Sequence, residues 1–416
     1  MVEPFKIKRS QLQLPFTRAR HVAVTWKEAT IIWGGYSSNE TVTNSQVDVH
    51  LSGKWTREDT RGDVPSIDRS HTGCVAHVVD DIMFVLSTSY YFANTVDLYS
   101  LDLNNWIWAK LVPNGTQPMG LGHWHFSSWV HNKKIFIFGG EIQNQGFLNV
   151  RQLICYNIAS NSWEWPNQKG DIPWVHSMHS TVINGNDLYL FGGLRFRPSA
   201  AAKYINDLYI LDMISMRWTQ VHGDLSDSKV PSGKLNDCNG TVLTRISQHK
   251  AVLLGTNRIG ENECWLLNLA NAKQHMDASS IWTRMPNYSR RFGATVCEPV
   301  SRSLWVIGGF VDTYGPYGPE ARTYLRVSRM TSEVLIMPLN PSLKDMAVAT
   351  AARNHCLKDA RLAPDSLATN LRNEIEEYRR EIGGKYVCSE QERCSRCKPA
   401  SPAMNKDPTN AYCNII

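Results

Sequence analysis

Three basic residues follow a glycine pair near the middle of the chain and could bind an anion. Arg195, Arg197 and Lys203 come directly after Gly192-Gly193, and Lys234 stands further along the chain. The planar guanidinium of arginine matches a carboxylate through two parallel hydrogen bonds. These charges indicate either a binding site for an anionic group or a solvated surface, and the residues alone leave both interpretations open.

Cysteines near the end of the chain have spacings that suggest metal or lipid chemistry. Cys388, Cys394 and Cys397 form a C-x5-C-x2-C pattern without a fourth ligand at short spacing, so we expect no zinc site. The last four residues, beginning at Cys413, fit the CaaX prenylation pattern. Cys413 is therefore a candidate prenylation site, and we expect membrane attachment only if it is modified.

A repeating framework must position these residues. A short apolar run followed by two small residues occurs six times, and the second small residues stand at positions 35, 88, 140, 193, 256 and 309. The differences between these positions are 53, 52, 53, 63 and 53. In most copies a second apolar run follows, and then a tryptophan. We assign this last position to Trp55, Trp106, Trp163, Trp218 and Trp282.

Each repeat is predicted to form a four-stranded antiparallel sheet. Short runs of apolar and aromatic residues bounded by Gly, Asn and Ser are typical of strands. Glycine after the second strand permits a positive φ and a close approach, and the tryptophan offers a large apolar face. One such sheet cannot bury both of its faces, so we predict an all-β fold with six blades closing into a propeller over residues 15–340. The fourth interval is longer, and we assign the extra length to the fifth unit, as a loop insertion at 271–280 before its last strand.

Histidines recur near the start of the units, for example His21, His125 and His179. Because these histidines occupy corresponding positions in different blades, we expect them to form hydrogen bonds between neighbouring blades rather than to bind a ligand. No short-range set of metal ligands accompanies these histidines, so we expect no metal site.

The composition changes after residue 340, because all 14 tryptophans precede it. Leu343, Ala347 and Ala351 recur at helical spacing, and Pro364 begins a second apolar stripe that contains Leu367 and Leu371. We predict a helical extension over 341–382 and a disordered, Cys-bearing tail over 383–416. The apolar stripe alone fits a cap on the propeller, a weak dimer contact or a helix that binds a partner.

The overall composition is that of an ordinary soluble protein. Lys and Arg total 44 against 38 acidic residues, and the resulting net charge of +6 is too small for this length to suggest nucleic-acid binding. The chain does not begin with an apolar segment of the secretory type, so we expect it in the cytoplasm or nucleus. There, the cysteines within apolar runs are predicted to be buried thiols: Cys74, Cys155, Cys264 and Cys297.

The apolar run, glycine pair, tyrosine and tryptophan at a period near 50 resemble the kelch repeat. The segment from Ser342 with Leu343, Ala347 and Ala351 resembles the BC-box that binds elongin C, and Ala363 to Leu371 resembles a cullin-2 box. In this order after kelch repeats, the motifs resemble the kelch-repeat substrate receptors of cullin-2 RING ubiquitin ligases. This resemblance implies a non-catalytic subunit without a cofactor, whose partners are elongin B/C, cullin-2 with its RING subunit, and protein substrates.

The same resemblance implies that the propeller binds C-terminal degrons and that arginines of the fourth unit hold the free carboxylate. Arg195, Arg197, Lys203 and Lys234 are then the substrate-binding candidates. The contacts to elongin C would come from Leu343, Ala347 and Ala351, and those to the cullin from Pro364, Leu367 and Leu371. The alternative is a non-catalytic kelch scaffold, membrane-attached or cytoskeletal, in which the helices are only a cap or dimer contact.

Overall fold

The computed structural model describes the strands of one β-rich unit. The described residues are 8–13, 17–19, 21–35, 37, 44–66, 73–88, 96–116, 118, 126–140, 151–174, 179–197, 200–223, 231, 242–256, 262–285, 295–297, 303–307, 310–317, 323–330 and 333–338. The chain divides into two units, Met1–Leu339 and Asn340–Ile416, and all the described residues belong to the first. The extension expected at 341–382 and the tail expected at 383–416 lie outside the described residues.

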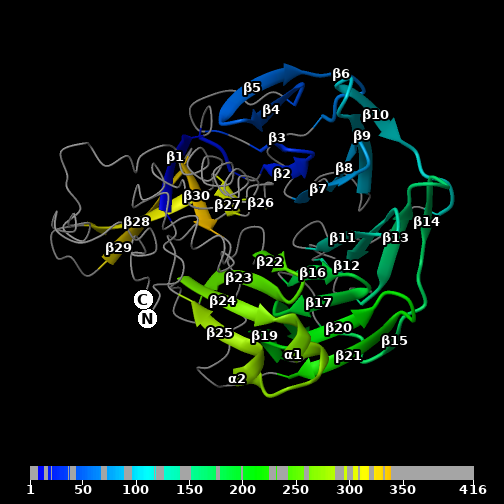
Figure 1. Cartoon of the computed structure of the whole chain (residues 1–416), viewed down its shortest axis with the longest axis vertical. Coiled ribbons are helices and arrows are strands. Elements are labelled where there is room, and N and C mark those ends of the chain that lie inside the picture. The colour runs from blue at the N-terminus through cyan, green and yellow to red at the C-terminus, as the bar shows by residue number, and fades with distance from the viewer. Residues whose placement is uncertain are drawn as a thin grey trace, which may run out of the picture. The chain divides into compact units, whose positions relative to one another are not determined.

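Five sheets are each built from one continuous stretch of the chain (Figure 1). The first contains β2 (Val22–Trp26), β3 (Ala29–Trp33), β4 (Gln46–Leu51) and β5 (Lys54–Asp59). The second contains β6 (Arg61–Gly62), β7 (Gly73–Val79), β8 (Ile82–Thr88), β9 (Val96–Asp102) and β10 (Ile107–Leu111). The third contains β11 (Ser127–His131), β12 (Lys134–Phe138), β13 (Leu153–Asn157) and β14 (Ser162–Glu164).

The fourth sheet contains β15 (Lys169–Gly170), β16 (Ser180–Asn184), β17 (Asp187–Phe191), β20 (Leu208–Asp212) and β21 (Arg217–His222). The fifth contains β22 (Val242–Ser247), β23 (Lys250–Thr256), β24 (Asn262–Asn268) and β25 (Trp282–Met285). The long strands of these five sheets pair antiparallel, as predicted. The short strands β6 and β15 were not predicted, and each adds a parallel strand at the outer edge of the sheet that follows it in the ring.

A further sheet joins strands from both ends of the unit. It has the order β1-β30-β27-β26 and combines β1 (Lys8–Gln13) with β26 (Thr295–Cys297), β27 (Ser303–Ile307) and β30 (Glu333–Pro338). The innermost strands β2, β7, β11, β16, β22 and β26 contact one another in that order, and β26 also contacts β2. The prediction of an all-β propeller is therefore confirmed, but the structure has five blades of continuous chain rather than the predicted six. The composite sheet lies where the sixth repeat was expected.

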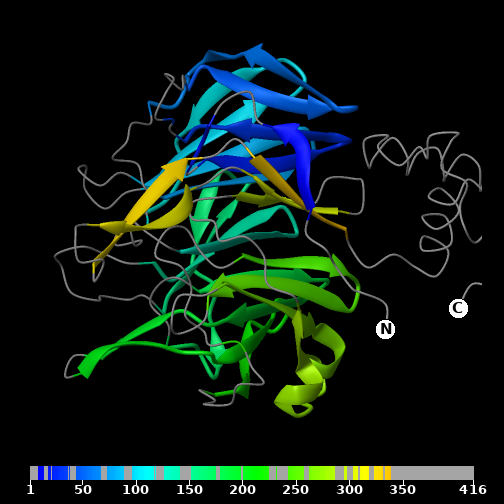
Figure 2. The ribbon, with the colours of Figure 1, turned by 90° about the vertical axis from the view of Figure 1, so that its left-hand side faces the viewer.

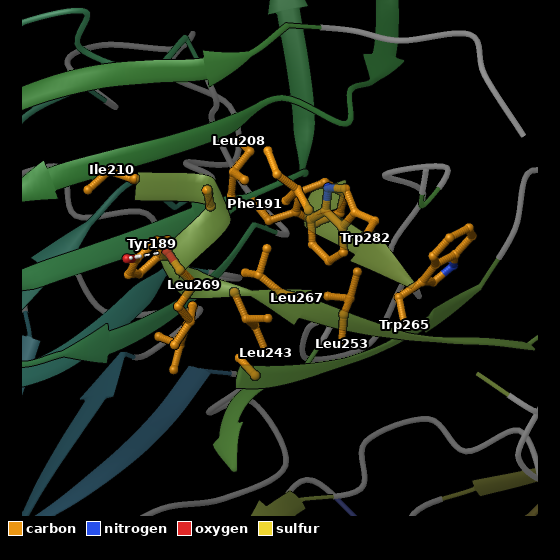
Figure 3. Close-up of a cluster of buried hydrophobic side chains, with 14 residues drawn as sticks. Tyr189, Phe191, Leu208, Ile210, Leu243, Leu253, Trp265, Leu267, Leu269 and Trp282 are labelled. Atoms are coloured by element: carbon orange, nitrogen blue, oxygen red, sulfur yellow. Dashed lines mark hydrogen bonds between the residues drawn. The ribbon is translucent and has the colours of Figure 1, made fainter. Parts of the chain in front are cut away.

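Neighbouring blades pack through strands whose side chains alternate between two interfaces. On β17, Leu188 and Leu190 face the third blade, whereas Tyr189 and Phe191 face the fifth. Figure 3 shows the second of these interfaces, where the ring centroids of Phe191 and Trp282 lie 4.7 Å apart. Burial on both faces explains why the second strand of each repeat is a continuous apolar run.

In three blades the residue before the glycine pair contacts the repeat tryptophan of the next blade. Trp33 lies 5.0 Å from Trp108, and Phe138 lies 5.2 Å from Trp218. The assignment of Trp106 to the repeat position is therefore wrong. Trp108 pairs with Leu101 just as Trp218 pairs with Leu211, whereas Trp106 is in the preceding turn with a φ of 56°. The pattern was misread because two tryptophans stand two residues apart.

The glycine pairs have the role that the sequence indicates. Gly34 and Gly35 have φ values of 69° and 78°, which L-residues with a side chain rarely adopt. A Cβ on Gly35 would stand only 2.6 Å from the carbonyl oxygen of Ala19 and 2.8 Å from the backbone nitrogen of His21. The second glycine is required because the chain entering the blade passes directly against it.

The predicted insertion of the fifth unit folds into two short helices. They are α1 (Leu269–Lys273) and α2 (Ala278–Ile281), and both lie between β24 and β25. Leu269, Ala272 and Ile281 are buried in the interface with the fourth blade. The Tyr189 hydroxyl donates to the carbonyl of Leu269 at 3.0 Å (Figure 3). The insertion therefore extends the apolar core, although it was expected to be a loop.

A buried ion pair attaches the segment that enters the ring to the first blade. Arg18 donates from Nη2 to Oδ2 of Asp48 at 2.6 Å, and these side chains are only 5% and 3% exposed. Arg57 donates from Nε to the other carboxylate oxygen at 2.8 Å. Asp48 thus holds two arginines, one from the entering segment and one from β5.

We expect Asp48→Asn to lower the free energy of unfolding by about 3–5 kcal/mol, because removing one partner of a buried ion pair is strongly destabilising. Urea denaturation measures this loss. The control is Lys110→Ala, which breaks a pair with Asp97 in which both side chains are more than 40% exposed; it should cost less than about 1 kcal/mol. Equal effects of the two substitutions would contradict the structural role of Asp48.

Two histidines should make the fold sensitive to acid. Burial, with a smaller contribution from Arg18, lowers the pKa of His21 from 6.5 to about 3, and burial lowers that of His77 to about 4. Because the unfolded chain binds these protons more readily, stability should fall as the pH falls from 6.5 towards 4. His77→Gln should flatten this part of the pH profile in chemical denaturation, and a profile as steep as that of the parent would contradict this prediction.

Candidate functional site

The directions of the strands give the ring two different faces. One face, here called the turn face, carries the tight turns between consecutive strands, whose residues include Lys27, Asp80 and Lys133 with positive φ. The opposite face, here called the loop face, carries the glycine pairs and the segments that follow them. The hairpin β18 (Leu194–Arg197) and β19 (Ala200–Tyr204) and the hairpin β28 (Phe310–Tyr317) and β29 (Thr323–Met330) extend from the loop face, whereas α1 and α2 lie on the turn face (Figure 2).

Arg195 lies at the base of the hairpin on the loop face. Its Nη2 atom is 2.5 Å from Oδ2 of Asp207, and its Nε atom donates to the carbonyl of Trp174 at 3.1 Å. Asp207 is almost fully buried and its Oδ2 also accepts from the Tyr209 hydroxyl at 3.2 Å. The guanidinium is therefore held in place, and its charge is balanced by a carboxylate of the same blade.

The hairpin brings two more of the predicted residues close together in the backbone. Lys203 stands directly opposite Arg195, and Arg197 stands opposite Ala200 after an irregularity in the register. Lys234, the fourth predicted substrate-binding residue, lies outside the described residues. So do Leu343, Ala347, Ala351, Pro364, Leu367, Leu371 and Cys413, so their assignments remain predictions.

Arg151 and Trp174 form a second feature of the loop face, which the sequence analysis missed. The guanidinium carbon of Arg151 lies 4.6 Å from the ring centroid of Trp174, within the range of a cation–π contact. Nη2 of Arg151 donates to the carbonyl of Ile172 at 2.5 Å. Trp174 remains 53% exposed. The only signal in the sequence is that Trp174 occupies none of the repeat positions.

A short chain of hydrogen bonds fixes the backbone around Arg151. Gln168 donates from Nε2 to the carbonyl of Arg151 at 2.8 Å, and its Oε1 accepts from the indole nitrogen of Trp218 at 2.8 Å. Arg151 precedes β13 of the third blade, whereas Trp218 is the repeat tryptophan of the fourth. The Arg151 and Trp174 pair therefore lies where two blades meet, beside Arg195.

Of the histidines predicted to connect neighbouring blades, His179 does so, whereas His125 lies outside the described residues. His179, at the entry to the fourth blade, has Nε2 3.2 Å from the carbonyl oxygen of Phe138 on β12. His77 of the second blade has Nε2 2.7 Å from the hydroxyl of Ser128 in the third. Within the described part of the chain, no group of three potential ligands could hold a metal ion.

The described cysteines are free thiols of low reactivity, and two of the three are buried. Cys155 and Cys264 are buried, and desolvation is the main cause that raises the pKa of each thiol to about 12. Desolvation also raises the pKa of Cys74, which is partly buried, to about 11. The side chain of Cys297 is outside the description. Of the helices that are described, none is long and apolar enough to cross a membrane.

Comparisons with known proteins agree with the repeat pattern. Residues 20–257 and, overlapping them, 93–309 match the model of the KLHDC2/KLHL20/DRC7 Kelch-repeats domain. The chain is 25% identical over 247 residues to kelch domain-containing protein 2 of Bos taurus, an alignment covering 51% of this chain and 58% of that protein. It is 29% identical over 216 residues to kelch domain-containing protein 3 of Rattus norvegicus, covering 48% of this chain and 56% of that one.

These relatives are therefore matched over little more than half of their own length. Among solved structures, that of YjhT superposes with a TM-score of 0.50 at 12% identity, covering 78% of this chain and 96% of that one. Because so low an identity shows similarity of fold alone, this superposition supports the propeller and nothing about activity.

We expect Cys155 and Cys264 to resist alkylation by iodoacetamide at pH 8 in the native protein, because the thiolate is the reactive form. Mass spectrometry of the digested protein measures the modification of each cysteine before and after unfolding in urea. Modification of either residue in the native protein at the rate seen in urea would contradict the burial described here.

Proposed function

Because the chain belongs to the KLHDC2/KLHL20/DRC7 kelch-repeat family, we propose that it is the substrate-recognition subunit of a cullin-2 RING ubiquitin ligase. In this proposal the propeller binds C-terminal degron peptides, and the segment after residue 340 binds elongin C and cullin-2. The chain itself is non-catalytic, since transfer of ubiquitin takes place on other subunits. Its site of action is the cytoplasm or nucleus.

The observation that carries the proposal is the basic hairpin on the loop face. Lys203 pairs opposite Arg195 in the hairpin, so two cationic residues lie close together in the backbone. The net charge of the whole chain is only +6. Long loops on one face of a rigid ring are the usual location of binding residues. A C-terminal peptide carries a carboxylate in every case, and arginine recognises that group with defined geometry.

The arrangement at the end of the propeller also supports the proposal. We infer that the sheet β1-β30-β27-β26 acts as the sixth blade, because its innermost strand contacts both the fifth and the first. Its strand β30 ends at Pro338, and the BC-box-like segment begins at Ser342. The two box-like segments therefore follow directly after the strand that closes the ring.

Recognition by the extension would follow the helix-in-groove mode. Leu343, Ala347 and Ala351 stand at helical spacing and would face elongin C, and Leu367 and Leu371 would contact the cullin. Prenylation at Cys413 would add membrane attachment to the same assembly without changing these contacts.

We expect Leu343→Arg to abolish capture of elongin C and cullin-2 by the full-length chain, because a charge in an apolar pocket is strongly unfavourable. Leu367→Arg should retain elongin C and lose most of the cullin-2. Immunoblots of affinity pull-downs from cell extract measure both partners. Leu357→Arg, a leucine between the two boxes, is the matched control and should behave like the parent.

Failure of the parent chain to capture either partner, with a folded propeller, would overturn the ligase proposal. The scaffold function would then be the better account of the same ring. Equal capture by all three variants would show that the partners bind elsewhere on the chain.

A further inference from the structure

The segment that links the second blade to the third differs from the links before and after it. Strand β6, Arg61–Gly62, pairs with the outer strand β10 of the second blade, and β15, Lys169–Gly170, pairs with β21 of the fourth. At the corresponding place of the third blade Asn114 pairs with Ser162, and Gly115 follows it. Each of these three links therefore ends in a residue and a glycine, but the residue is an asparagine only in the link to the third blade.

Both backbone groups of Asn114 attach this link to the third blade. Its N–H donates to the carbonyl of Asn161 at 2.6 Å, and its carbonyl accepts from the N–H of Trp163 at 3.3 Å. Nδ2 of Asn161 also donates to the carbonyl of Val112 at 3.1 Å. The contact between the outer edges of these two blades, here called the seam, thus depends on the main chain at Asn114.

The glycine of this link has open space around it. A Cβ on Gly62 or Gly170 would stand 2.2 Å from the carbonyl oxygen of a repeat tryptophan, whereas a Cβ on Gly115 would have no atom within 4 Å. Asn114 and Gly115 are both exposed to solvent. Nδ2 of Asn114 lies 3.5 Å from the carbonyl oxygen of Ser160, at the long limit of a hydrogen bond. Little in the described residues therefore keeps the side-chain amide away from the next backbone nitrogen.

We propose that Asn114 is a site of spontaneous deamidation. The backbone nitrogen of Gly115 attacks Cγ of Asn114, a new C–N bond closes a cyclic imide, and the bond from Cγ to Nδ2 breaks. Ammonia leaves with the proton that the glycine nitrogen gives up. Water then opens the imide at either carbonyl, which yields aspartate or isoaspartate. Glycine favours the attack because it has no side chain to obstruct its own nitrogen.

Isoaspartate at this position weakens the seam. The main chain then passes through Cβ and Cγ and is one carbon longer, and the former backbone carbonyl becomes part of a free carboxylate. The bonds to Asn161 and Trp163 depend on the original spacing of the N–H and C=O groups, so they cannot both keep their geometry. The outer contact between the second and third blades therefore loosens as the protein ages.

Asn184-Gly185 is an internal control, because it has the same two residues in a different setting. It lies where β16 turns into β17, and Nδ2 of Asn184 donates to the carbonyl of Gln248 at 2.9 Å. Its Oδ1 accepts from Arg245 at 3.4 Å. The fifth blade thus holds both ends of this amide, and the turn must open before the ring can close. A third pair, Asn239-Gly240, lies outside the described residues.

The experiment incubates the full-length chain at neutral pH, folded in buffer and unfolded in urea. Mass spectrometry of the digested protein, with fragmentation that distinguishes isoaspartate from aspartate, measures the products at each asparagine over time. In urea Asn114 and Asn184 should react at similar rates. In the folded chain Asn184 should react roughly tenfold more slowly than in urea, whereas Asn114 should keep most of its rate. Equally slow reaction of both residues in the folded chain would refute the site.

Two variants of Asn114 test the effect on the seam. Asn114→Lys removes the reactive amide and places there the residue type of Lys169 in the next link, so the fold should tolerate it. Asn114→Asp adds the charge of the product without lengthening the main chain. Hydrogen exchange at the Trp163 amide should rise as isoaspartate accumulates in the parent and stay low in both fresh variants. Unchanged exchange in the aged parent, or an equal rise in aged Asn114→Lys, would refute the weakening of the seam.

Discussion

The contact between the end of a second strand and the repeat tryptophan of the next blade is the interaction on which the rest of the molecule depends. It occurs three times among the described residues, as Trp33 on Trp108, Phe138 on Trp218 and Phe191 on Trp282. Each buries a large aromatic surface at the end of a second strand, next to the glycine pair that lets the entering chain pass. Because these interfaces supply much of the buried apolar surface, the loop-face segments add only a few residues to the core, such as Ile205.

The candidate site on the loop face combines buried and exposed groups. The buried network of Asp207, Tyr209 and Arg195 belongs to the frame of the fourth blade. The cation–π pair of Arg151 and Trp174 sits at the boundary with the third blade and extends outward. A ligand on this face would therefore meet Arg195, which Asp207 neutralises, and Arg151, for which the described residues supply no carboxylate. The difference follows from a buried aspartate, which a count of basic residues does not reveal.

Much of the frame could be predicted from the sequence, because the constraints that build it are periodic. Apolar runs before small residues predicted the second strands, and the insertion expected at 271–280 lies where α1 and α2 form. Trp106 was misassigned because the sequence shows the spacing of tryptophans but not the register of β9 on β10. The parallel strands β6 and β15 were missed because two residues at an edge leave no periodic signal. Arg151 and Trp174 were missed for a related reason: their contact joins two blades, and no local pattern in the sequence links them.

The composite sheet has a consequence for how the protein is made. β1 leaves the ribosome long before its partner β30, because some three hundred residues separate Gln13 from Glu333, with which it pairs. At cellular rates of elongation the first strand waits roughly 15 to 60 seconds for its partner. During this time it presents an unpaired edge, so protection by chaperones and the order of blade formation matter for this chain more than for a protein whose sheets all close locally. The same arrangement makes a chain truncated before β30 an open ring with two exposed edges.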